Sequence, residues 1–310
     1  MSLDKKLGKL VGRYRIARPA NFRLADFDPA DTGGLGIGKD EARKIVADHG
    51  RRLATLQEKL YAQDKWSVLM ILQGMDAAGK DGIVEHVLYG VNPLGCDVHS
   101  FKAPNAEELD HNYLWRVARR LPERGRIGIF NRSHYEECLV VRVHPEILAK
   151  QKLPPPLVTR NIWKERFEDI CAFERHLVRN GMVVLKFHLR ISKEEQRRRF
   201  LDRLNDPDKR WKFAMGDVAE RGLWNKYMAA YQDMIRQTSI PEAPWIVVPA
   251  DHKWFARLLV SLALVEAMER LDLKFPLAGE HSPAELKKVA SALEAEGRAE
   301  AGVRRAKSRD

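Results

Sequence analysis

Short apolar runs alternate with longer amphipathic segments through most of the chain. The apolar runs predict strands, and the amphipathic segments between them predict helices. The predicted strands span about 66–72, 96–101, 127–130, 182–189 and 245–248. The predicted helices span about 40–62, 83–88, 105–118, 161–180, 192–204, 218–238 and 253–273. This alternation predicts an α/β fold, a three-layer sandwich in which helices cover both faces of a central parallel sheet.

One strand leads directly into a glycine-bearing motif. Residues 74–82 read GMDAAGKDG, which contains the G-x-x-x-x-G-K spacing of a phosphate loop, and an amphipathic helix follows. In such a loop, successive backbone N–H groups and the positive end of the helix surround phosphate groups. The predicted phosphate-binding residues are Gly74, Ala77, Ala78, Gly79, Lys80 and Asp81. Lys80 would also place its charge on the transferred phosphoryl group. The alternative is a strand-to-helix turn that binds no ligand.

Two acidic residues set this loop apart. Asp81 stands where most phosphate loops have the Ser or Thr that binds Mg²⁺. Asp76 lies inside the loop, where its carboxylate would repel phosphate unless a cation lay between them. We therefore predict that Asp76 binds Mg²⁺, directly or through water. Asp81 either shares that role or is a first-turn acid that the helix dipole favours.

A second polar cluster follows the strand at 127–130, and the carboxyl ends of parallel strands are where such folds bind ligands. Asn131 is a neutral residue where many phosphate-loop proteins have a metal-binding Asp. Arg132 would direct its guanidinium at phosphate oxygens, or else pair with Glu136 or Glu137. His134 would touch a base or ribose, although a histidine beside a strand end is more often packed.

A basic stretch at 190–212 contains nine Lys and Arg residues against five Asp and Glu. On a helix, Gln196, Arg199 and Arg203 share one face. The residues predicted to point toward a core are Phe200, Leu201 and Leu204. The pattern predicts a helical lid over about 192–222 that closes over phosphates, with a solvated face of alternating charge as the alternative.

Composition narrows the possible partners and compartments. The net charge is +11 and the isoelectric point is about 9.5, which favours a polyanionic partner. The three cysteines show no metal-binding spacing, no apolar block follows the N-terminus, and no window has the length of a membrane helix. We expect a cytoplasmic protein without membrane contact. The expected organisation is an N-terminal extension at 1–39, taken as irregular, a phosphate-loop domain at 40–276 and a charged tail at 277–310.

Several segments together resemble the polyphosphate kinase 2 family, over about residues 22–276. They read GMDAAGKDG (74–82), FNRSHYE (130–136), ISKEEQ (191–196), DPDKRWKF (206–213) and APWIVVPAD (243–251). The resemblance implies a phosphate-loop kinase-like fold and Mg²⁺-dependent transfer of a phosphoryl group between inorganic polyphosphate and nucleotides. It implies catalytic roles for Asp76, Lys80, Arg132 and Arg203. It implies polyphosphate contacts from Arg199, Lys209 and Arg210, and nucleotide contacts from Asn131, Arg132, His134 and Glu136.

The segment at 130–136 also indicates a subgroup. It reads FNRSHYE, as in class III members of that family, whereas class I members usually read FDRSWYN. The resemblance therefore implies phosphorylation of AMP to ADP and of ADP to ATP, with purines preferred and with direct in-line transfer. Because Asn131 replaces an Asp, no magnesium ligand is carried over to that position. A homodimer or homotetramer is the expected assembly.

Two other classes of protein remain as alternatives from the sequence. An ATP-dependent small-molecule kinase of the thymidylate-kinase type would share the fold, the loop and an arginine-rich lid. A non-enzymatic module could instead bind nucleic acid through its basic surface, although we expect no nucleic-acid partner. Only the enzymes need Asp76 and Lys80, and only a polyphosphate kinase works without ATP as the donor.

Overall fold

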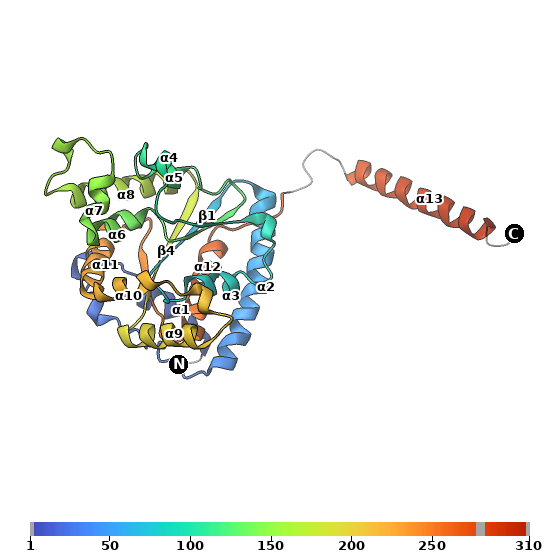
Figure 1. Ribbon diagram of the computed structural model, residues 1–310. Coiled ribbons are helices and arrows are strands. Elements are labelled where there is room, and N and C mark those ends of the chain that lie inside the picture. The colour runs from blue at the N-terminus through green and yellow to red at the C-terminus, as the bar shows by residue number, and fades with distance from the viewer. Residues whose placement is uncertain (1–2, 277–282, 308–310) are drawn as a thin grey trace. The chain divides into compact units, whose positions relative to one another are not determined.

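A five-stranded, all-parallel sheet forms the centre of the protein. The computed structural model describes residues 3–276 and 283–307, and these divide between residues 273 and 274 into two compact units. The strands are β1 (Ser67–Gln73), β2 (Cys96–Ser100), β3 (Ile127–Asn131), β4 (Met182–Arg190) and β5 (Trp245–Pro249). Their order is β2-β3-β1-β4-β5, so the central strand is the one that enters the phosphate loop (Figure 1). The predicted α/β fold and its parallel sheet are confirmed.

Helices cover both faces of this sheet. On one face α2 (Lys39–Gln63), α3 (Lys80–Val87) and α12 (Lys253–Glu269) pack against one another (Figure 1). On the other face α8 (Ile162–Arg179) packs with α11 (Trp224–Thr238). The central run 68–72 is fully buried between these layers, which explains why β1 is continuously apolar rather than alternating.

The structure has further helices and short turns, of which α13 (Pro283–Lys307) belongs to the second compact unit. The other helices are α1 (Leu3–Tyr14), α4 (Ala106–Leu109), α5 (Trp115–Ala118), α6 (Val140–Val143), α7 (Pro145–Lys150), α9 (Lys193–Asn205), α10 (Met215–Gly222) and α13 (Pro283–Lys307). Short 3₁₀ turns are η1 (Pro19–Asn21), η2 (Leu24–Asp26), η3 (Pro93–Gly95), η4 (His134–Cys138), η5 (Pro155–Leu157) and η6 (Arg210–Lys212). The helix α13 occupies much of the predicted tail, of which 277–282 and 308–310 lie outside the described residues.

Three local predictions are wrong. The first residues are not irregular, because Leu10, Val11 and Tyr14 of α1 are buried in the core, where α1 contacts α12 and β5. The helix predicted at 218–238 is two helices, α10 and α11, which meet at Leu223. The helix predicted at 105–118 is reduced to the short turns α4 and α5.

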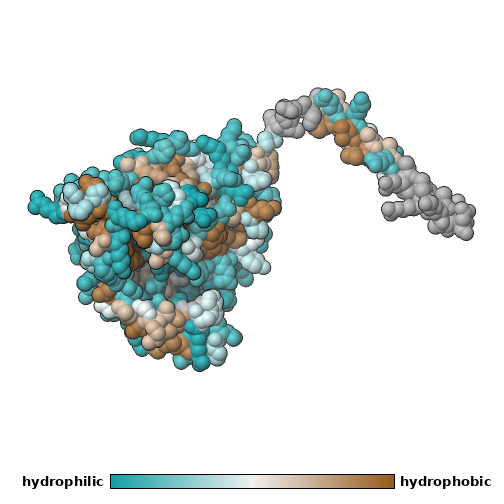
Figure 2. All heavy atoms as spheres, turned by 45° about the horizontal axis from the view of Figure 1, so that its top comes forward, coloured by the Kyte–Doolittle hydropathy of each residue, from teal (hydrophilic) through white to brown (hydrophobic). Residues whose placement is uncertain are grey.

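Hydrophilic residues dominate the face shown in Figure 2, with smaller apolar patches between them. Within the residues that the structure describes, no helix combines the length and the apolar character needed to cross a membrane.

A buried polar network holds the segment after β3 to the centre of the sheet. Lys186 of β4 and Glu174 of α8 are completely buried, and their Nζ and Oε2 atoms lie 2.6 Å apart. The Lys186 Nζ also donates to the Tyr135 hydroxyl at 3.0 Å and to the Thr238 carbonyl at 2.6 Å. The Tyr135 hydroxyl donates to Glu174 at 2.6 Å. Because the Lys186 ammonium, the Glu174 carboxylate and the Tyr135 hydroxyl bond to one another, this network holds η4, which begins two residues after Arg132.

We expect Lys186→Met to lower the free energy of unfolding by about 3–5 kcal/mol, because it leaves the Glu174 carboxylate buried without its cation. Urea unfolding would measure the change. The matched control is Lys164→Met, which removes an exposed lysine of α8 that pairs with Glu168 at 3.8 Å. Equal effects of the two substitutions would show that the buried network does not stabilise the fold.

Candidate active site

The loop between β1 and α3 has the backbone shape of a phosphate loop. A Cβ atom at Gly74 would lie 2.8 Å from the Leu189 carbonyl oxygen, so only glycine fits there. Gly79, the residue before α3, has φ +107°, and Ala77 adopts φ +62°, which is strained for a residue with a side chain. Strain that persists in a well-packed loop indicates that the surrounding structure fixes its shape.

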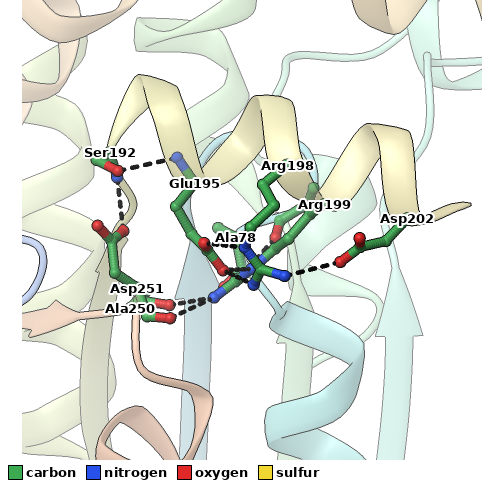
Figure 3. A network of polar contacts seen from close by, with 9 residues as sticks. Ala78, Ser192, Glu195, Arg198, Arg199, Asp202, Ala250 and Asp251 are labelled. Atoms are coloured by element: carbon green, nitrogen blue, oxygen red, sulfur yellow. Dashed lines mark hydrogen bonds and ion pairs between the residues drawn. The ribbon is translucent and has the colours of Figure 1, made fainter.

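The helix α9 holds this loop from outside (Figure 3). Arg199 donates from Nη1 to the Ala77 and Ala78 carbonyls at 2.9 and 3.0 Å, and from Nη2 to the Ala250 carbonyl at 2.5 Å. Gln196 donates to the Asp76 carbonyl at 2.9 Å. These contacts fix the loop through its carbonyl oxygens, while one of its N–H groups, that of Ala78, donates to the Met75 carbonyl at 3.1 Å. In this structure the Arg199 guanidinium binds carbonyl oxygens of the loop and of Ala250. The direct phosphate contact expected of Arg199 stays a prediction.

Lys80 folds back over the loop that precedes it. Its side chain is buried, and Nζ donates to the Gly74 and Met75 carbonyls at 2.7 and 3.3 Å. Burial lowers the pKa of Lys80, and the nearby Asp76 carboxylate partly opposes that effect. An ammonium group that is desolvated and held by neutral carbonyls is well placed to transfer its hydrogen bonds to a phosphate.

Arg132 lies between two carboxylates at the end of β3. It adopts φ +63°, and its Nη2 lies 2.7 Å from Asp76 Oδ1 while its Nη1 lies 3.8 Å from Glu136 Oε2. Burial raises the pKa of Glu136, against the lowering effect of the Arg132 and Lys80 charges. Glu137 pairs elsewhere, with Arg166 at 2.5 Å. Arg132 is therefore ion-paired with Glu136, as one of the two alternatives expected, and also with Asp76 of the loop, while its contact with phosphate oxygens stays a prediction.

Asn131, the last residue of β3, and Asp81, in the first turn of α3, contact each other. The Asn131 Nδ2 donates to Asp81 Oδ1 at 2.6 Å, and Asp81 occupies the first turn of α3. The contact orients a carboxylate next to the phosphate loop. It is compatible with either predicted role of Asp81, magnesium binding or interaction with the helix dipole.

These groups line one cleft of about 860 Å³ at the carboxyl ends of the strands. The predicted residues that line it are Asp76, Ala77, Ala78, Gly79, Lys80, Asp81, Asn131, Arg132, Arg199, Arg203 and Lys209. Gly74 is not among the residues that line the cleft, but its carbonyl oxygen accepts a hydrogen bond from Lys80, which does line it. The structure therefore brings most of the predicted site together from the loop after β1, from α3, from the end of β3, and from α9 and the residues that follow it.

Other predicted residues lie apart from the cleft. His134 is buried against the rings of Tyr135 and Phe173, at 4.6 and 5.9 Å between centroids, so the structure does not place it where a base could reach it. Arg210 donates to the Leu204 carbonyl at 2.8 Å. The prediction that Leu201 and Leu204 point into a core is wrong, since 43% and 39% of their surfaces are exposed.

Several cleft residues were missed from the sequence. Asp217 of α10 lines the cleft, and burial together with the Asp76 charge raises its pKa. Lys102 follows β2, and Lys253 and Arg257 lie in the first turns of α12, directly after β5. Each of the three basic residues follows the carboxyl end of a strand, so the rule that located Arg132 could have found them.

The parallel sheet, the strained loop with its inward lysine and the arginine-bearing helix α9 beside it define a phosphate-loop phosphotransferase. A family model described as polyphosphate kinase 2 matches residues 36–276. The chain belongs to the polyphosphate kinase 2 family, so the expectation from the sequence motifs is confirmed.

Individual relatives agree with this assignment. The chain is 48% identical over 276 residues to a Rhodopseudomonas palustris protein named ADP-polyphosphate phosphotransferase, covering 86% of this chain and 94% of that protein. It is 47% identical over 264 residues to a Meiothermus ruber protein named AMP/ADP-polyphosphate phosphotransferase, covering 85% and 95% of the two chains. The crystal structure of polyphosphate kinase 2 from Arthrobacter aurescens TC1 superposes with a TM-score of 0.83 at 38% identity, covering 92% of this chain and 96% of that one.

Proposed function

We propose that the cleft transfers a phosphoryl group between inorganic polyphosphate and both AMP and ADP. The observation that carries the proposal is that Lys80, Arg132 and Arg203 line the same cleft as the phosphate loop, with Asp76 paired to Arg132. Phosphoryl transfer needs positioning and charge neutralisation more than covalent chemistry, and this cleft supplies both. The net charge of +11 suits a donor that is a long polyanion.

The choice of acceptor rests on the segment that follows β3. The two relatives described above differ in their names, one acting on ADP and the other on AMP or ADP. The FNRSHYE segment of this chain resembles that of class III members, which favours both acceptors. We infer that AMP is phosphorylated to ADP and ADP to ATP, reversibly, with Asn131, Arg132 and Glu136 near the nucleotide.

The protein groups would act together in a direct in-line transfer. The loop N–H groups hold a phosphate, and Lys80 moves its hydrogen bonds from the Gly74 carbonyl to the transferred phosphoryl oxygens. Arg132 neutralises a second oxygen, and the lid places Arg203 over the same group. No histidine or cysteine is among the described residues that line the cleft, which favours transfer without a phosphohistidine or phosphocysteine intermediate.

The acidic residues fit a hydrated magnesium ion better than a dedicated metal cage. No cluster of three or more His, Cys, Asp or Glu side chains suited to a metal occurs in the part of the chain that the structure describes. Mg²⁺ characteristically uses one or two carboxylates, retained waters and substrate phosphates. Asp76 would hold it, since Arg132 occupies only Oδ1. When bound, the ion would neutralise charge between the donor and acceptor phosphates.

The assay that tests the function combines purified protein with Mg²⁺, long-chain polyphosphate and either AMP or ADP, followed by nucleotide chromatography. We expect ADP and then ATP from AMP, and ATP from ADP. Product from ADP alone would remove AMP as an acceptor but keep the family activity. Turnover only when ATP is the donor would favour a small-molecule kinase of the thymidylate-kinase type.

The assembly and the compartment stay predictions. A homodimer or homotetramer in the cytoplasm agrees with the sequence, and size-exclusion chromatography with light scattering would determine the number of subunits.

A further inference from the structure

The helix α10 borders the catalytic cleft, although its side chains are largely exposed. Ala214, the residue before the helix, and Asp217, in its first turn, both line the cleft. The apolar side chains of Met215 and Val218 are 82% and 54% exposed. All eight residues of α10 are described, and none of them is buried. Because apolar burial does not fix this helix, its position depends on polar contacts.

The last turn of α10 is bound at two places, and the first is α9. Arg221 donates from Nη1 to the Lys193 carbonyl at 2.6 Å and to Gln196 Oε1 at 3.0 Å. Gln196 in turn donates to the Asp76 carbonyl of the phosphate loop at 2.9 Å. This contact therefore connects the end of α10 to the loop.

The second place is Glu220, which contacts a histidine from a distant part of the chain. The Nε2 atom of His144 lies 3.0 Å from a Glu220 carboxylate oxygen, and its Nδ1 atom lies 3.1 Å from Glu146 Oε1. A neutral imidazole has one N–H group, and carboxylate oxygens accept hydrogen bonds. Both contacts can be hydrogen bonds only when the ring is an imidazolium, so protonated His144 links α10 to α7.

The backbone of His144 is fixed between α6 and α7. Its N–H donates to the Val140 carbonyl at 2.9 Å, and its carbonyl accepts from the Ile147 N–H at 2.9 Å. The His144 side chain is 21% exposed. The charged side chain of α6 nearest in sequence, Arg142, pairs with Asp233 of α11 at 2.6 Å. His144 is thus a fixed point from which a side chain can hold the exposed helix.

The neighbours of His144 set its charge. A hydrogen bond from Glu220 raises the pKa of His144, partial burial opposes this effect, and Glu146 adds to the rise. The imidazolium contacts therefore stabilise the folded protein fully below the pKa of the unfolded chain, and this stabilisation is lost as pH rises through the raised folded pKa. The Tyr227 hydroxyl of α11 donates to Glu220 at 2.5 Å and keeps its proton, since burial raises its pKa. The Arg142 guanidinium stays charged throughout.

We propose that His144, as an imidazolium, is a positioning residue that holds α10 beside the catalytic cleft through Glu220. The inference rests on the proposed function, because the cleft that α10 borders is the one in which transfer would take place. Loss of the contact lowers the fraction of molecules in which Asp217 and the start of α10 complete the cleft. The loop cations are untouched, so the loss acts on kcat more than on the binding of polyphosphate.

The first test is amide hydrogen exchange of residues 215–222 in the ligand-free protein, with each variant compared with the wild type at the same pH. His144→Gln has a neutral donor, as the neutral imidazole has. It should exchange roughly five- to tenfold faster than the wild type at about pH 6 and within about twofold of it at about pH 9. His144→Arg keeps a charge and several N–H donors, so it should stay as slow as the pH 6 wild type at both pH values, after correction for the intrinsic rate.

The matched control is His176→Gln, which removes an exposed histidine of α8 whose ring contacts Asn180. It should leave the exchange of residues 215–222 unchanged at both pH values. Equal exchange in His144→Gln and the wild type at about pH 6 would overturn the inference, as would an equal increase at both pH values.

The second test is steady-state transfer from polyphosphate to ADP by the same proteins. His144→Gln should lower kcat roughly five- to tenfold at about pH 6, and the difference from the wild type should close at about pH 9. The KM for polyphosphate should stay within about twofold. His144→Arg should restore kcat, and a kcat no better than that of His144→Gln would contradict a role for the charge. Exchange is measured without turnover, so a protein whose α10 responds as expected but which transfers no phosphoryl group would refute only the proposed function.

Discussion

Lys80→Met is expected to lower kcat about 10³-fold or more, because it removes the mobile charge that the transferred phosphoryl group needs in its transition state. The fold should survive this substitution. Lys80 contacts carbonyl oxygens rather than a buried carboxylate, so no uncompensated charge is left behind. The pKa of Lys80 is lower in the folded protein than in the unfolded chain, so its positive charge lowers the free energy of unfolding. This destabilisation is lost as pH rises through the folded pKa, because the folded protein then holds Lys80 in its neutral form.

The measurement for Lys80 pairs steady-state kinetics with thermal unfolding at neutral pH. The variant should unfold at a temperature no lower than the wild type. The control is Lys44→Met, which removes an exposed lysine of α2 and should leave both quantities unchanged. A kcat within tenfold of the wild type would show that Lys80 does not act on the transferred group.

Asp76→Asn is expected to lower kcat about 10²- to 10³-fold and to raise the Mg²⁺ concentration needed for half-maximal activity. The substitution keeps the shape of the side chain but removes its charge. Arg132 then loses its 2.7 Å partner, and the cleft loses the carboxylate best placed to hold a cation between phosphates. Both losses act on the transition state more than on the binding of a nucleotide.

The measurement for Asp76 is kcat as a function of free Mg²⁺, made in parallel for Asp76→Asn, Asp81→Asn and the control Asp40→Asn. Asp40 is an exposed first-turn acid of α2, as Asp81 is a first-turn acid of α3. A shifted Mg²⁺ dependence for Asp81→Asn would assign it to the metal, and behaviour like the control would assign it to the helix dipole. An unchanged dependence for Asp76→Asn would contradict its proposed role.

The sequence predicted the parts of the fold that depend on local patterns. The apolar run 68–72 and the glycine spacing after it determine a strand, a loop and a helix without help from distant residues. The helix α1 was missed because its apolar residues are interrupted by lysines and glycines, and its burial depends on contacts with α12 and β5.

The site could be predicted in part for the same reason. Asp76 and Lys80 belong to the loop, and Arg132 directly follows a strand, so their positions follow from chain order. The role of Arg199 depends on carbonyls from two distant segments, at 77–78 and 250–251, which no spacing along the chain reveals. His134 was given a nucleotide contact from its place in a motif, but the packing around Tyr135 turns it into the core.

The central claim is that the phosphate-loop cleft moves a phosphoryl group from polyphosphate directly onto a nucleotide. The most direct test is a single turnover with ³²P-labelled polyphosphate, Mg²⁺ and AMP, without ATP, followed by separation of nucleotides and protein. The account predicts label in the β-phosphate of ADP, none on the protein, and no transfer by Lys80→Met. Label trapped on the protein, or none in ADP unless ATP is supplied, would contradict it.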